Sequence, residues 1–346
     1  MGVNHSEILI RTLLRNGIRD IQDSPHRAIR KMVDMAAIFA NGAFQQQFFQ
    51  TAQQMLEDES SGYYTLVQNL VRNTDEERLI TYGMNLGFNG CTRGASQIRR
   101  MEAEEGFNIP WSISLEISGD DFHEKESRYQ ELIRQGEELG IYCWVLFPEQ
   151  EPYEILSLAR QHPGSAFAVV CPSGSNIGML IDEAQDCNNL MVAIPYDSLA
   201  GTASGMLRDA GFLYCLYHPY NADRLPDIEN GHLLEQIEDL NPAFCVLIPE
   251  KDCPEAVQAK VHQAVLEGRL SQDYRMILWE FIRDSMLVDS VISEEGYWAA
   301  FDKDGSFHEC RTTGTSVVLN ASDQCLKEIL RSAGRRGPEK NTDTIL

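Results

Sequence analysis

The chain has 346 residues, of which 43% are hydrophobic and 23% are charged, and its formal net charge is −23. This size and composition suit one large folded domain with additional segments at its ends. The strong negative charge excludes nucleic acids and anionic membrane surfaces as expected partners, because both are bound through basic patches.

Nine cysteines are scattered through the chain without a C-x-x-C pair. The odd count, the irregular spacing and an N-terminus without the pattern of a secretory signal are typical of the reducing cytoplasm. No apolar run approaches the ~18 residues that a membrane-spanning helix needs. We therefore expect a cytoplasmic protein with no membrane contact and with reduced thiols.

Residues 1–78 are expected to form a helical segment. Apolar residues recur with a period of 3.6 over residues 8–18 and again over 29–39. Ser24 followed by Pro25 is a typical helix start, with serine as the N-cap and proline in the first turn. The apolar faces of these helices need a partner, and a dimer is therefore one open alternative for the oligomeric state.

From residue 79 onward the sequence predicts a β/α repeat. Five apolar segments run directly into prolines, at Pro148, Pro172, Pro195, Pro219 and Pro249, and helix-like patterns lie between them. Proline is tolerated at the exit of a strand because its missing N–H costs the sheet little there. Since these segments are continuously apolar, we expect parallel strands that are buried on both faces.

Similar apolar segments at 79–85, 112–117 and 276–282 extend the series to six to eight β/α units. The predicted fold is α/β, a full or partial parallel (β/α) barrel over residues 79–290, and an open doubly wound sheet is the alternative. Residues 291–333 are expected to add a hairpin with its turn at Asp304 and Gly305, a further strand and a short helix. The polar tail 334–346 is expected to be disordered.

Ligands of parallel barrels bind the loops beyond the carboxyl ends of the strands. In this sequence such positions are rich in carboxylates, including Glu280, and His218 ends one apolar segment. Asp197, His218 and Glu250 are therefore candidate catalytic residues for acid–base chemistry or for binding a divalent cation. Two other interpretations stay open, that the carboxylates only hydrate the rim and that His218 is a neutral structural histidine.

Residues 172–178, which include Ser173, form a Gly-rich segment that opens a helix. Its backbone N–H groups could hold an anion. An ordinary β/α turn is the alternative, because the segment lacks the lysine of a phosphate-binding P-loop.

The segment 81–91 resembles the cluster-binding loop of the radical S-adenosylmethionine (radical SAM) family. That family carries C-x-x-x-C-x-x-C after a strand, and its three thiolates hold a [4Fe-4S] cluster that binds S-adenosylmethionine (SAM). In this chain Asn85, Leu86 and Cys91 match the motif. The first two cysteine positions hold Met84 and Phe88.

Residues 117–122 are similar to another segment of the same family, whose backbone contacts the methionine end of SAM. Here Gly119 matches, and Asp120 stands where the family has a glycine. The resemblance implies a ligand pocket at the barrel mouth, lined by Asn85, Cys91, Gly119, Asp120 and Ser173. A charged Asp120 in this pocket would repel the carboxylate of SAM or attract a cationic ligand.

One thiolate cannot hold a four-iron cluster, so Cys91 is left as a weak candidate metal ligand. We expect a radical-SAM-like barrel that has lost the [4Fe-4S] cluster and its radical chemistry and acts as a ligand-binding or regulatory pseudoenzyme. SAM stays a candidate cofactor, and a small molecule or a peptide is the expected partner. Two alternatives stay open: a hydrolase or lyase that uses the rim carboxylates, with or without a divalent metal, and an active radical SAM enzyme with unusual ligands such as Cys310.

Overall fold

The structure is a computed structural model that describes residues 5–38, 43–119, 121–293, 296–311, 316–320 and 324–333. Its sheet has the strand order β10-β9-β8-β1-β2-β3-β4-β5-β6-β7. Strands β8 and β1 to β7 are parallel, and β9 is antiparallel to both β8 and β10. The strands are β1 (Ser112–Ile117), β2 (Cys143–Pro148), β3 (Ala166–Val170), β4 (Leu190–Pro195), β5 (Tyr214–Tyr220), β6 (Phe244–Pro249), β7 (Ile277–Glu280), β8 (Tyr297–Phe301), β9 (Ser306–Arg311) and β10 (Ser316–Asn320).

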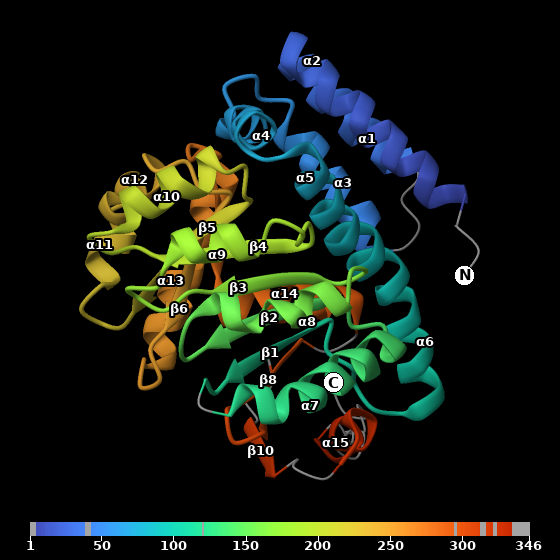
Figure 1. Cartoon of the computed structure of the whole chain (residues 1–346). Helices are drawn as coiled ribbons and strands as arrows, with labels where there is room; N and C mark the ends of the chain where they lie inside the picture. Colours follow the sequence, from blue (N-terminus) through green and yellow to red (C-terminus); the bar gives the residue numbers. More distant parts are fainter. Residues whose placement is uncertain are drawn as a thin grey trace, which may run out of the picture.

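Helices surround this sheet, and Figure 1 shows α1 and α2 at the opposite end of the molecule from β10 and α15. The helical elements before the sheet are α1 (His5–Asp23), α2 (Pro25–Ile38), α3 (Ala43–Met55), α4 (Gly62–Asn73), α5 (Glu76–Gly83), the π-helix η1 (Met84–Gly94) and α6 (Ala95–Glu105). Those that follow are α7 (Phe122–Leu139), the 3-10 helix η2 (Pro152–Ile155), α8 (Leu156–Gln161), α9 (Ile177–Glu183), α10 (Ala200–Asp209), α11 (Leu225–Glu229), α12 (His232–Glu238), α13 (Glu255–Ser271), α14 (Phe281–Ile292) and α15 (Leu326–Ala333).

The sheet curls strongly, so that strands distant in the strand order face each other. The ring centroids of Phe147 in β2 and Phe281, directly after β7, lie 5.7 Å apart. In a flat sheet, five strand spacings of about 4.8 Å would separate these strands. Phe281 also lies edge-on to Trp298 of β8, at 6.3 Å. The predicted parallel α/β fold is therefore confirmed as a partial barrel, since β7 and β8 do not pair within the described ranges.

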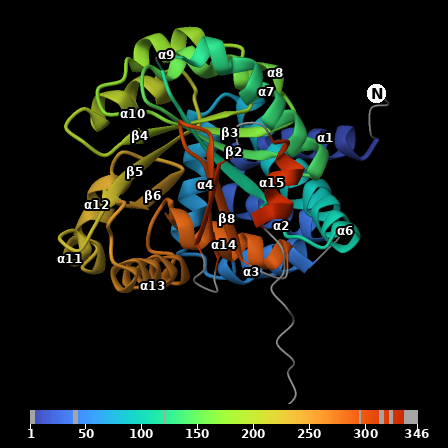
Figure 2. The same cartoon turned by 90° about the horizontal axis from the view of Figure 1, so that it is seen from below.

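The two faces of the sheet differ in burial. Alternate residues such as Leu115, Leu146 and Leu247 are fully buried in the main core, and helices α7 to α13 lie around this side of the sheet (Figure 2). The other side, which we call the open face, keeps partly exposed side chains. The expectation of burial on both faces is therefore confirmed only in part. On the open face Val170, Ala193 and Cys215 are buried, whereas the larger side chains around them stay partly exposed. The open face carries Val145, Phe147, Ala168, Met191, Tyr217, Phe244, Val246, Ile248, Trp279 and Trp298.

The strand expected at residues 79–85 is absent, because these residues lie in α5 and at the start of η1. The Asp75 side chain accepts hydrogen bonds from the N–H groups of Glu77 and Arg78, which caps the start of α5. Ile80 and Met84, four positions apart, are buried on one side of the helix. The helical segment expected over 1–78 thus continues to Glu105, and the sheet begins at Ser112.

The C-terminal prediction is confirmed for the hairpin β8–β9, the strand β10 and the helix α15, and Asp304 and Gly305 lie in the hairpin turn. The extension is part of the main sheet, since β8 pairs with β1. The tail 334–346 lies outside the described residues. Within the described ranges, every helix is too short or too polar to cross a membrane.

Candidate functional site

The residues expected to form one ligand pocket lie at two opposite edges of the sheet. The Asn85 side chain donates hydrogen bonds to the carbonyls of Pro163 and Ser165, at 2.8 and 2.9 Å. These carbonyls directly precede β3, so Asn85 lies at the amino edge of the parallel strands. Cys91 lies there too, because its neighbour Gly90 packs against the Cys143 sulfur at the start of β2.

Gly119 and Ser173 follow β1 and β3 and lie at the carboxyl edge. A six-residue strand spans roughly 20 Å, so Asn85 and Cys91 cannot share a pocket with them. Asp120 lies outside the described residues. The pocket is not assembled because the segment that resembles the cluster loop is helical and packs beneath β2 and β3.

The thiols at this edge do not fit a [4Fe-4S] cluster, which takes thiolate ligands. Burial raises the pKa of the Cys91 thiol to about 12 and also raises that of Cys143. Met84 is buried, and Phe88 packs with it in an apolar cluster. Across the described ranges, no group of three or more His, Cys, Asp or Glu side chains is placed to hold a metal ion.

At the carboxyl edge, polar residues pair across neighbouring strands. The Ser173 hydroxyl donates to Asp197 at 2.6 Å, which joins the exits of β3 and β4. The Asn221 side chain donates to Glu250 at 2.9 Å, which joins the exits of β5 and β6. Ser173, Asp197 and Glu250 therefore lie on one rim, at the carboxyl edge of the sheet. Each of the two carboxylates there already accepts a hydrogen bond that fixes a loop.

The Gly-rich turn after β3 is occupied by a carboxylate of the protein itself. The N–H of Asn176 donates to Glu151 at 3.0 Å, and the Asn176 side chain caps α9 by accepting from the N–H of Met179. Since α9 has only 7 residues, its N-terminus supplies little field for an external anion. The structure agrees with the alternative of an ordinary β/α turn.

His218 lies on β5 between the two paired carboxylates. Its ring is perpendicular to that of Tyr196, with centroids 6.1 Å apart. Burial lowers the pKa of His218, and the nearby Arg224 charge adds to this effect while Glu250 opposes it. The imidazole is therefore neutral at pH 7. Asp197 and Glu250 follow β4 and β6, whereas His218 lies within β5 on the same side as Leu216. No hydrogen bond joins the three residues to one another within the described ranges.

The open face is the feature that the sequence prediction missed. Its aromatic side chains Phe147 and Trp298 both lie edge-on to Phe281, and the Tyr217 hydroxyl donates to the carbonyl of Cys171 at 2.9 Å. Glu116 of β1 is exposed on this face. Large apolar residues occupy every second position of these strands, which was a signal for the open face. The residues between them are apolar as well, so the sequence did not show which of the two faces would be covered.

The helical segment closes the amino edge of the open face. Tyr82 of α5 is buried in a cluster with Ala166, Leu213 and Ala243, which directly precede or begin β3, β5 and β6. Met191 and Phe244 of the open face pack against this cluster. A molecule bound to the open face would therefore reach it from the carboxyl edge, where the paired carboxylates lie.

Glu280, expected on the rim, is instead buried beneath it. It accepts hydrogen bonds from the Tyr220 hydroxyl at 2.7 Å and from the N–H of Arg283 at 2.6 Å, and it caps α14. Burial raises its pKa despite these bonds. Glu280 is therefore a structural residue that holds the start of α14 and, with it, the position of Phe281.

The raised pKa of Glu280 predicts a pH-dependent difference between the wild type and Glu280→Gln. Below the carboxyl pKa of the unfolded chain, both states carry the neutral acid and the residue contributes no pH dependence. As pH rises above the carboxyl pKa of the unfolded chain, the unfolded wild type ionises first. Its free energy then falls relative to that of the folded protein, whose buried carboxyl is still neutral, so the wild type loses stability. We expect Glu280→Gln to gain stability relative to the wild type between pH 5 and pH 8. Urea unfolding at both pH values measures this, and an unchanged difference would contradict it.

Comparisons with known proteins were made against family models, curated sequences and solved structures. No family model matches this sequence, and no curated protein shows significant sequence similarity. Streptococcus suis SuiB bound to S-adenosylmethionine is similar in structure, with a TM-score of 0.50, 8% identity and 72% of each chain covered. SuiB bound to the precursor peptide SuiA gives a TM-score of 0.49 at 9% identity, also over 72% of each chain. The chain therefore has a mostly parallel α/β fold that is similar to the fold of SuiB.

Proposed function

We propose that this chain is a ligand-binding protein on a radical-SAM-like barrel that has lost the iron–sulfur cluster. Its ligand lies against the open face and enters from the carboxyl edge. The observation that supports this most directly is an apolar, aromatic face that stays partly exposed, closed at its amino edge by the buried Tyr82 cluster. Exposed apolar faces of this kind are typical of binding surfaces.

The chemistry of the surface favours a ligand with an apolar body and a positive charge. Phe147, Trp279 and Trp298 offer ring surfaces that attract cations and stack on planar groups. Glu116 and Glu149 are exposed near the same edge, and acidic residues dominate the chain as a whole. SAM is the first probe to test, because it combines a sulfonium cation with a planar adenine, and the structure of similar fold was solved with SAM.

Calorimetric titration with SAM tests this proposal. We expect binding to the wild type and a loss of affinity of up to about fivefold in Glu116→Gln, because one exposed carboxylate near a cation contributes at most about 1 kcal/mol. Glu124→Gln in α7 is the matched control, since it removes an exposed carboxylate away from the open face. Equal affinities of the two variants would place SAM elsewhere.

Iron and sulfide analysis after anaerobic reconstitution tests the loss of the cluster. We expect no stoichiometric iron, because Met84 and Phe88 occupy two of the three cysteine positions of the motif and one thiolate cannot hold a four-iron cluster. Stoichiometric iron that disappears in Cys91→Ala, or in Cys310→Ala, would restore radical chemistry as the working hypothesis.

A second candidate function is a cluster-free hydrolase or lyase at the rim. It is favoured by the placement of Asp197 and Glu250 at the exits of β4 and β6, on either side of β5, which carries His218. A neutral imidazole can accept a proton from a substrate, and the flanking carboxylates could bind a divalent cation. Stabilisation by Mg²⁺ or Mn²⁺ that is lost in both Asp197→Ala and Glu250→Ala would support this candidate over a pure binding protein.

A further inference from the structure

Large apolar side chains are exposed on the outer surface of α9 and α10. Met179, Leu199 and Met206 are 42%, 56% and 39% exposed, and we call these three residues the α9–α10 patch. The two helices are neighbours on the outer side of the sheet (Figure 2). The patch is therefore separate from the open face, which lies on the other side of the strands.

The three residues of the patch lie close together. Leu199 and Met206 are two helical turns apart, which places them on one face of α10. The Met206 side chain reaches across to α9, because a Cβ added to Gly178 would be 3.3 Å from its Cε atom. Met179 directly follows Gly178 in the chain. Gathered apolar side chains of this kind are typical of protein-binding surfaces, and methionine adapts its shape to a partner.

The surface beside the patch is low enough for a helix to approach. Gly205 precedes Met206 in α10, and a Cβ added to Gly205 would meet no atom within 4 Å. Thr202, one turn before Met206, is exposed and small. A partner helix can therefore come near the backbone of α10 and place its side chains between Leu199 and Met206, as the ridges of one helix pack into the grooves of another.

The charged side chains around the patch are mostly acidic. Asp182 and Glu183 are exposed on α9, three and four positions after Met179, which places them on the same side of that helix. Asp209 is exposed on α10, three positions after Met206. A partner that carries basic side chains beside its apolar ones would complement this border.

The two arginines nearest to the patch do not cancel this negative charge. Arg160 pairs with Asp186 at 2.9 Å, and Arg208 interacts with the Tyr214 hydroxyl. With Asp186 included, four carboxylates stand against two guanidinium groups at this surface. The border of the patch therefore keeps an excess of negative charge.

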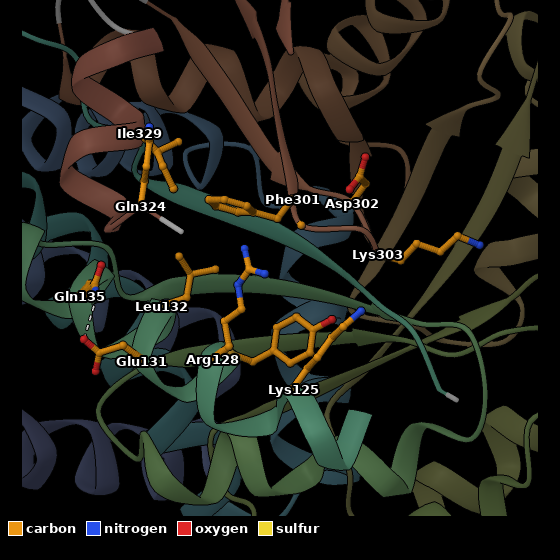
Figure 3. A pocket seen from close by; sticks show the side chains of 12 residues that line it. Lys125, Arg128, Glu131, Leu132, Gln135, Phe301, Asp302, Lys303, Gln324 and Ile329 are labelled. Atoms are coloured by element: carbon orange, nitrogen blue, oxygen red, sulfur yellow. Dashed lines mark hydrogen bonds between the residues drawn. The ribbon is translucent and has the colours of Figure 1, made fainter. Parts of the chain in front are cut away.

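A small pocket between α7, the turn that joins β8 to β9, and α15 is less suited to a charged partner (Figure 3). Two of its cations are matched by carboxylates, since Lys125 pairs with Asp121 at 2.6 Å and Lys303 pairs with Glu149 at 2.7 Å. The α9–α10 patch differs from this pocket because its border has an excess of one sign of charge.

We propose that the α9–α10 patch binds a basic amphipathic helix of a partner protein. The apolar side of that helix lies over Leu199 and Met206, and its basic side chains lie beside the carboxylates of the border. A second copy of this chain is a poor occupant, because it brings the same acidic border and a net charge of −23. The patch does not depend on the ligand of the open face.

Titration with two synthetic peptides tests the proposal. Both peptides have about 18 residues with the apolar spacing of an amphipathic helix, and one consists of leucine and lysine, the other of leucine and glutamate. We expect the leucine–lysine peptide to bind, with an affinity that falls as NaCl rises. The leucine–glutamate peptide should bind at least about tenfold more weakly. Fluorescence anisotropy of the labelled peptides measures both affinities.

A double variant, Leu199→Gln with Met206→Gln, shows whether the peptide binds at the patch. We expect it to bind the leucine–lysine peptide about tenfold or more weakly than the wild type, because two apolar contacts are lost. Leu270→Gln is the matched control, since Leu270 in α13 is 71% exposed and lies outside the patch. Its affinity should equal that of the wild type. Met179→Gln, with an expected loss of about threefold, gives a second test if the double variant is poorly folded.

Two results would overturn the proposal. Equal affinities of the double variant and of Leu270→Gln would show that the peptide binds through the net charge of the protein alone. A dimer in sedimentation velocity that is lost in the double variant would show that a second copy of the chain occupies the patch.

Discussion

Replacing Arg78 with leucine is expected to lower the free energy of unfolding by about 3–5 kcal/mol, because three carbonyl acceptors, two of them in buried hydrogen bonds, then lose their donor. The Arg78 guanidinium donates to the carbonyls of Ala184, Gln185 and Cys187, at 3.3, 3.2 and 3.0 Å. It also lies over the ring of Phe212, 3.7 Å from the centroid. A leucine keeps part of the packing but supplies no N–H. Urea unfolding at 25 °C measures the loss.

Arg15→Leu is the matched control in the same helical segment. Arg15 pairs with Glu76 and Glu77, and the three side chains are more than 40% exposed. Exposed pairs of this kind contribute at most about 1 kcal/mol. Similar losses in both variants would contradict the prediction, because the hydrogen bonds of Arg78 would then contribute no more to stability than an exposed ion pair.

Replacing Asp284 with alanine is expected to cost about 3–5 kcal/mol, because removing one partner of a buried ion pair leaves the other uncompensated. Asp284 is 1% exposed and accepts from Arg269 at 2.6 Å. Its other oxygen accepts from the N–H of Glu280 at 2.7 Å. Asp284 thus fixes the junction between β7 and α14, which places Phe281 across the open face. Chemical denaturation at pH 7 measures the change.

The double variant Arg269→Met with Asp284→Leu separates charge from packing. It removes both charges and keeps apolar volume, so it should recover most of the stability lost in Asp284→Ala. The single variant Arg269→Met, which leaves the buried carboxylate without its cation, should be less stable than the double variant. If the double variant is as unstable as Asp284→Ala, the loss is due to the other partners of Asp284, the N–H of Glu280 and the His262 ring, and not to the pair with Arg269.

The rim of the candidate site was predictable, but its lining was not. Ser173, Asp197 and Glu250 follow parallel strands, and the carboxyl ends of parallel strands always meet at one edge. Asn85 and Cys91 were assigned to the same edge only because residues 79–85 were expected to be a strand. The capped helix α5 moves both residues to the amino edge, where they pack beneath β2 and β3.

The sequence by itself determined the parallel repeat, the C-terminal hairpin and the helical N-terminal segment, because each is encoded in local periodicity and turn residues. Only the tertiary structure decided whether residues 79–94 are strand or helix, since a short apolar run fits either period until capping and packing select one. The same holds for the open face and for the burial of Glu280. These features depend on contacts between segments far apart in the chain, for which no local pattern exists.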